Sequence, residues 1–139
     1  MTAQTSTRTG GVLASLLVLY TLASLLHFAH NAEYLAEYPN LPTWLTRVGI
    51  YVTWIAIASV GLVGYVLHRC GRERFGLALL AVYATLGLDG LLHYTRAPFS
   101  AHTTAMNFTI LFEVVAATLT LIAVVALAAK EIQTGTRSW

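Results

Sequence analysis

Apolar positions along the chain form four long stretches, separated by short segments rich in polar residues or proline. The stretches cover residues 11–30, 48–67, 75–94 and 104–129. Each has about the 20 residues that an α-helix needs to cross the hydrocarbon core of a bilayer. The pattern therefore predicts an all-α integral membrane protein with one four-transmembrane-helix domain over residues 1–139.

The three connections between these stretches are short. The first contains Pro39-Asn40-Leu41-Pro42, the second is the charged turn at residues 68–74, and the third, at residues 95–103, contains Pro98. Short connections make successive helices antiparallel. We expect an up-down-up-down four-helix bundle. The first stretch exceeds the apolar core of a signal peptide, so we expect it to be a retained helix.

The composition supports the same class and excludes others. Hydrophobic residues make up 57% of the chain and charged residues only 10%, whereas soluble domains carry roughly 25% charged residues. The net charge of +2 and the lack of a basic run argue against a nucleic-acid partner. The sequence has no glycine-rich nucleotide motif. We expect the lipid bilayer as the partner, with a homodimer or a larger membrane complex left open.

The basic residues predict the orientation of the bundle. Six of the eight lie at one end if the helices alternate: Arg8, Arg69, Arg72, Arg74, Lys130 and Arg137. Cytoplasmic ends carry the excess of Lys and Arg, so both termini are expected in the cytoplasm. The protein is then expected in a plasma membrane of the bacterial inner-membrane type, with its other end facing the exterior or periplasm.

Ionisable and amide side chains within the stretches gather in the outer half. Such residues are costly in a membrane and are functional candidates by default. Spacings of three and four residues place members of each group on one helix face. In a four-helix bundle such faces point inward, where facing helices hold metals or cofactors. The groups are His27, His30 and Asn31 on the first helix, Asp89 and His93 on the third, and His102, Asn107 and Glu113 at the fourth.

Imidazoles together with carboxylates suit divalent transition metals such as Cu, Zn, Fe or Mn. We expect four metal ligands, and Glu113 as the catalytic acid or base. Three further residues are candidates as alternative ligands or as groups that orient the ligands. The leading interpretation is a metal-dependent membrane enzyme or metal handler. The expected ligands are His27, Asp89, His93 and His102, and the further candidates are His30, Asn31 and Asn107.

One part of this set resembles a known site. Asp89 and His93, four residues apart and followed by His102, resemble the copper site in the membrane C subunit of particulate methane and ammonia monooxygenases. The resemblance implies copper as the metal. It covers these three residues alone, and the spacing from His93 to His102 is shorter than in that family.

Other functions fit the same residues. His27 and His93 each follow a Leu-Leu pair and precede an aromatic residue. This repeated pattern predicts similar depths, as axial ligands of a haem b would need. The buried polar residues could also form hydrogen bonds that only hold helices together, or a pathway for protons or a substrate. A non-catalytic accessory subunit and a small dimeric transporter are the remaining alternatives.

Overall fold

Four long helices form the chain in a computed structural model that describes residues 2–135, and the side chains of residues 11–133. Within this part the chain is helical and contains no strand. Four segments are long and apolar enough to cross a membrane, as in an integral membrane protein. The prediction of an all-α chain with four such helices is confirmed. In chain order the elements are α1 (Thr2–Glu33), η1 (Leu35–Glu37), α2 (Arg47–Arg69), α3 (Glu73–Leu86), η2 (Asp89–Leu91), α4 (Leu92–Arg96), η3 (Phe99–Ala101) and α5 (Thr104–Gly135).

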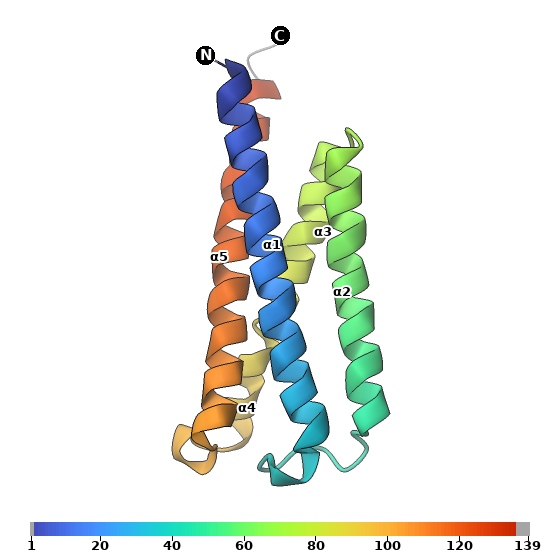
Figure 1. Cartoon of the computed structure of the whole chain (residues 1–139), viewed down its shortest axis with the longest axis vertical. Coiled ribbons are helices and arrows are strands. Elements are labelled where there is room, and N and C mark those ends of the chain that lie inside the picture. The colour runs from blue at the N-terminus through green and yellow to red at the C-terminus, as the bar shows by residue number, and fades with distance from the viewer. Residues whose placement is uncertain (1, 136–139) are drawn as a thin grey trace.

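The long helices pack around a common core. α1 lies beside α2 and α5, and α3 lies beside the same two helices (Figure 1). Tyr20 of α1 reaches across to α3, where its hydroxyl donates a hydrogen bond of 3.0 Å to the carbonyl of Tyr83. Both rings are buried, with Leu80 and Ala117 beside them in the same core. The aromatic contact therefore joins the two helices that lie diagonally in the bundle.

The outer surface of the helices is apolar, as a lipid-facing surface requires. Large side chains such as Val18, Val52, Leu62 and Ile122 are at least half exposed. Which end of the bundle faces the cytoplasm stays a prediction. Of the basic residues that predict it, Arg137 lies outside the described residues, and so does the side chain of Arg8.

The third apolar stretch is broken, where the sequence predicts one helix over residues 75–94. α3 ends at Leu86, and a turn followed by η2 leads into the short helix α4. Gly87 and Gly90 flank the break, and glycine is a poor helix former. The backbone of Gly87 also lies so close to Tyr20 that a Cβ atom there would overlap the tyrosine hydroxyl. The tight approach of Tyr20 and the two glycines account for the interruption.

The break changes the neighbours of the third span. α3 packs on both α2 and α5, whereas η2 packs on α5. Figure 1 shows the first half of α2 beside the end of α1, where Phe28 packs on Ile50, and apart from α4 and α5. The α1–α2 connection folds over the same end: Tyr38 is buried beside Met106 and Ile110. Asn40 donates a hydrogen bond of 2.9 Å to the carbonyl of Arg96, the last residue of α4.

Candidate polar site in the outer half of the bundle

His27 lies at the centre of a buried polar region between α1 and α5. Its side chain is 2% exposed, and its Nδ1 atom lies 3.5 Å from the hydroxyl of Thr109. That hydroxyl already donates to the carbonyl of Met106 at 3.0 Å. Thr109 can therefore only accept from His27, which places the proton on Nδ1 and leaves Nε2 unprotonated, as a hydrogen-bond acceptor.

Asn31 links His27 to His93 of α4. Its amide nitrogen lies 3.0 Å from Nε2 of His27 and 3.3 Å from Nε2 of His93. One NH2 group has two hydrogens, so it can donate to both rings. The two rings are in contact, with centroids 5.3 Å apart and planes nearly perpendicular. The expectation that these two histidines share one depth is confirmed, and Asn31 is the group between them.

Glu113 of α5 lies next to His27, deeper in the bundle. Its side chain is fully buried, and neither carboxylate oxygen has a hydrogen-bond partner. Oε2 lies 3.7 Å from Nε2 of His27. A buried carboxylate without a partner is costly, so this group must be protonated or paired with a cation. The unprotonated Nε2 of His27 is the nearest base that could take its proton, once the Asn31 amide that donates to the same atom turns away.

His102 lies next to His93 but outside the long helix. It precedes α5, and its Nδ1 atom lies 3.1 Å from the carbonyl of Pro98. A carbonyl only accepts, so Nδ1 carries the proton, and the buried Nε2 has no partner. The ring centroids of His93 and His102 are 6.0 Å apart. Asn107 holds this loop, donating to the carbonyls of Phe99 and His102 at 3.2 Å each.

His30 lies toward the end of α1 and is half-buried. Its Nδ1 atom lies 2.8 Å from the hydroxyl of Tyr38. The ring of Tyr38 in turn lies against His93, with centroids 5.0 Å apart. Burial raises the pKa of Tyr38 to about 12, so its hydroxyl keeps its proton at neutral pH. His30 is thus joined to the site through Tyr38.

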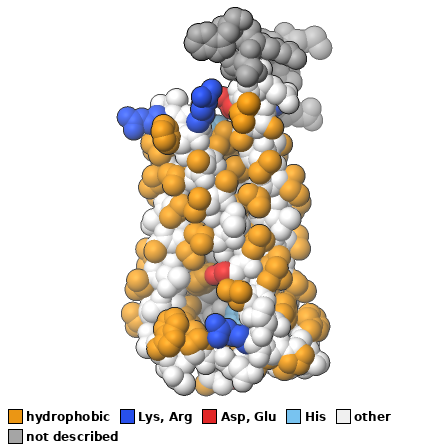
Figure 2. All heavy atoms as spheres, turned by 180° about the vertical axis from the view of Figure 1, so that it is seen from behind, with side chains coloured by type: hydrophobic (Ala, Val, Ile, Leu, Met, Phe, Trp, Pro, Cys, Tyr) orange, Lys and Arg blue, Asp and Glu red, His pale blue; other side chains and the backbone are white. Residues whose placement is uncertain are grey.

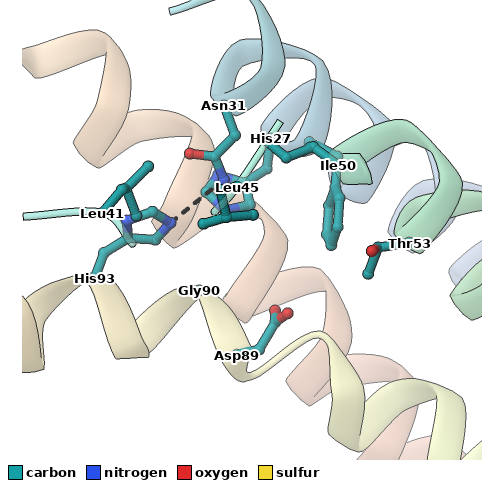
Figure 3. Close-up of a pocket in the computed structure, with 10 residues that line it drawn as sticks. His27, Asn31, Leu41, Leu45, Ile50, Thr53, Asp89, Gly90 and His93 are labelled. Atoms are coloured by element: carbon teal, nitrogen blue, oxygen red, sulfur yellow. Dashed lines mark hydrogen bonds between the residues drawn. The ribbon is translucent and has the colours of Figure 1, made fainter. Parts of the chain in front are cut away.

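A pocket of about 170 Å³ lies beside His27, Asn31 and His93 (Figure 3). Asp89 lies across this pocket from the histidines, and Thr53 of α2 also lines the pocket. Gly90 and four apolar side chains complete the lining: Phe28, Leu41, Leu45 and Ile50. Glu113 does not line the pocket, so His27 stands between the buried carboxyl and the cavity.

The structure thus brings together part of the set that the sequence predicts. His27, Asn31, His93 and Glu113 adjoin one another, and His102 touches His93. Asp89 is separate, because the break in the third span removes the regular helical spacing to His93. Within the part of the chain that the structure describes, no three His, Cys, Asp or Glu side chains are arranged to hold a metal ion. The assignment of ligands therefore stays a prediction.

Two members of the site are absent from the set predicted by sequence. Ser24 is buried one helical turn before His27, and its hydroxyl lies close to the Glu113 carboxyl without a hydrogen bond of normal geometry. Its position three residues from His27 was the available signal. Tyr38 is in a proline-rich turn, where the sequence favours an interfacial aromatic side chain. Only the folding of that turn over the bundle places it against His93.

Comparison with protein-family models, with curated proteins and with solved structures gives no match to this chain. Function must therefore be inferred from the chemistry of the site. The site combines a buried carboxyl, a neighbouring imidazole with an unprotonated Nε2, and a pocket on the far side of that imidazole.

Proposed function

We propose that this membrane protein binds a small ligand at an acid–base site in the outer half of its bundle. His27 faces the ligand in the pocket, and Glu113 behind it supplies or accepts the proton. Such a site suits a membrane enzyme that protonates or deprotonates its substrate. It equally suits a carrier that couples binding to a proton.

One observation carries the proposal: Glu113 is fully buried, lacks a hydrogen-bond partner, and has Oε2 3.7 Å from Nε2 of His27. A residue that only joined helices would satisfy its oxygens with neighbouring donors. Here the neighbours of the carboxyl are the Ser24 hydroxyl, which lies close without a hydrogen bond of normal geometry, and the imidazole of His27. A movement of under about 1 Å would bring the pair into hydrogen-bond range, where a proton can pass.

The hydrogen bonds of His27 identify Nε2 as the atom that would exchange a proton with Glu113. Thr109 fixes the Nδ1–H form, so Nε2 is the atom that accepts a proton. Asn31 shares the same atom at 3.0 Å. When Nε2 is protonated, the Asn31 amide must turn its oxygen toward the ring, which also changes its contact with His93. Proton transfer at His27 would therefore alter the wall of the pocket.

Infrared spectroscopy of the protein in lipid nanodiscs tests the exchange. A protonated carboxyl group has a C=O stretch distinct from that of a carboxylate, and Glu113→Gln identifies the part due to Glu113. We expect this band to depend on pH in the wild type. In His27→Phe it should become stronger and independent of pH, because the neighbouring imidazole is gone. Glu37→Gln, which removes an exposed carboxyl in η1, is the matched control and should leave the Glu113 band unchanged.

A Glu113 band that is identical in the wild type and in His27→Phe would contradict the proposal. It would mean that the two groups do not share a proton, and that Glu113 serves only the packing of α1 against α5.

A transition-metal site is the second candidate, and the state of His102 favours it. Its Nδ1–H is held by the carbonyl of Pro98, and its buried Nε2 is free. Metal-bound histidines are commonly oriented in this way. Metal binding would require Asn31 to leave the position between His27 and His93. A haem b would require these two rings to separate further, since both now face one amide group.

Metal analysis of purified protein tests this candidate. A stoichiometric Cu, Zn, Fe or Mn ion that is lost in His93→Ala would support it, with His68→Ala as the matched control away from the site. Metal content that is absent, or unchanged in His93→Ala, would exclude it.

A further inference from the structure

Asp89 has an unusual place for an acidic residue. It lies in the third apolar span, between Glu73 and Arg96, yet its side chain is exposed. Seen from behind, an acidic side chain lies low on a face covered mostly by apolar ones, with a histidine in a hollow nearby (Figure 2). A charged or polar group at membrane depth normally faces the bundle interior or a cavity. Asp89 lies at the mouth of the pocket that contains His27 and His93.

The pocket is covered on the side of the aqueous end. The α1–α2 connection folds over it, and Leu41 and Leu45 of this segment form part of its lining. Tyr38 is 4% exposed at the start of the segment, and Asn40 is tied to the carbonyl of Arg96 at 2.9 Å. Water would have to pass this apolar cover to reach the pocket.

The side toward the bilayer is less covered. Beyond the break at Gly87, η2 packs on α5, and the first half of α2 has lost the neighbour that α3 gives to its second half (Figure 1). Thr53 on α2 and Asp89 on η2 both line the pocket and both are exposed. The two residues therefore mark the edges of a lateral opening at membrane depth.

We infer that the pocket receives its ligand from the bilayer, between α2 and η2, and that the ligand is a lipid-soluble molecule whose polar head is not anionic. Phe28, Leu41, Leu45 and Ile50 suit an apolar body. Asp89, when ionised, would repel a carboxylate or phosphate at the mouth, and no Lys or Arg lines the pocket itself; the nearest cation is Arg96, which acts on His93 from outside the lining. The inference rests on the proposed function in one respect, namely that the polar head group of the ligand contacts His27.

Carbodiimides of different solubility test the route of entry in proteoliposomes. A carboxylic acid adds its O–H across one C=N bond of the reagent. The acyl group then shifts to nitrogen and gives a stable N-acylurea without a leaving group. We expect dicyclohexylcarbodiimide, which dissolves in lipid, to label Asp89 at least about tenfold faster than the cationic water-soluble reagent EDC, since charge excludes EDC from hydrocarbon. Peptide mass spectrometry locates the label, and Glu33 at the end of α1 is the control that EDC should reach.

Protection and blocking then test the class of ligand. We expect 1-decanol or decylamine to slow labelling of Asp89 several-fold, and decanoate at the same membrane concentration to have little effect. Thr53→Trp should fill the opening and slow labelling. Ile55→Trp, exposed on the opposite face of α2, should leave the rate unchanged.

Labelling by EDC at a comparable rate would overturn the inference in favour of access from water. Protection by decanoate alone would overturn the stated head group. No labelling by either reagent would mean that the opening is covered, for instance by a second copy of the chain. None of these results depends on proton exchange between Glu113 and His27. A negative infrared result with normal labelling of Asp89 therefore leaves the route of entry standing.

Discussion

At the scale of single residues, one amide group decides how the two central histidines face each other. Asn31 is half-buried and holds Nε2 of His27 at 3.0 Å and Nε2 of His93 at 3.3 Å. Its oxygen is buried without a partner. The amide nitrogen donates to both rings, and the amide oxygen accepts no hydrogen bond. If one ring gains a proton, rotation of the amide brings this oxygen into position to accept a hydrogen bond from it. The polar contacts of the pocket wall are in this sense adjustable.

Tyr38 makes the stability of the protein depend on pH in the alkaline range. Burial raises the pKa of Tyr38 from 10.0 to about 12 in the folded protein. The pKa of Tyr38 is higher in the folded protein than in the unfolded one. The stabilisation that comes from the protonated hydroxyl is therefore complete below pH 10 and is lost as the pH rises from 10 to 12. We expect the free energy of unfolding to fall by roughly 2–3 kcal/mol more in the wild type than in Tyr38→Phe over this range.

Denaturant unfolding in detergent at several pH values measures this difference. Tyr34→Phe is the control, because Tyr34 is 47% exposed and lies four residues away. An equal loss of stability in the wild type and in Tyr38→Phe would show that the hydroxyl ionises as easily in the folded protein as in the unfolded one.

At the scale of elements, the broken third span is the feature that shapes the site. The sequence pattern predicts one helix there, because apolar residues run almost without interruption from 75 to 94. Two glycines in a membrane span do not by themselves end a helix. The break begins at Gly87, where Tyr20 occupies the space that a side chain would need. It moves Asp89 away from the histidines and leaves the opening beside α2.

The α2–α3 pair depends on a close backbone approach at Gly76. A Cβ atom there would overlap the backbone of His68 on α2, which cannot move aside as a flexible side chain could. We expect Gly76→Ala to destabilise the protein by about 1–3 kcal/mol. Gly11→Ala is the matched control: it meets nothing within 4 Å on α1 and should be neutral or slightly stabilising. Unfolding in detergent gives both values, and equal stability of the two variants would contradict the packing argument.

At the scale of the whole molecule, the orientation in the membrane is open to a direct test with the native chain. Its single cysteine, Cys70, is exposed in the turn between α2 and α3. The distribution of basic residues places this turn in the cytoplasm. In intact cells we expect a membrane-impermeant maleimide to label Cys70 only after permeabilisation. In Cys70→Ser with Asn40→Cys, labelling should occur before permeabilisation, and the reverse pattern would invert the orientation.

The sequence by itself determined the class of the protein and the residues of interest. Four stretches of about 20 apolar residues can satisfy their backbone in a bilayer only as helices. The rarity of polar groups within them singles out His27, His93 and Glu113, because each is costly there unless it has a function or a partner. These conclusions need only local composition and spacing along the chain.

Only the tertiary structure decided which of these groups meet. Contacts between helices depend on their rotation and on breaks in their course, and those follow from packing between residues far apart in the chain. Tyr20 against Gly87 separates Asp89 from the histidines, whereas the fold of the first connection brings Tyr38 to His93. Neither contact leaves a periodic signal in the sequence. Apolar side chains at membrane depth look alike whether they face lipid or the core, so the pattern that predicts the helices cannot predict their faces.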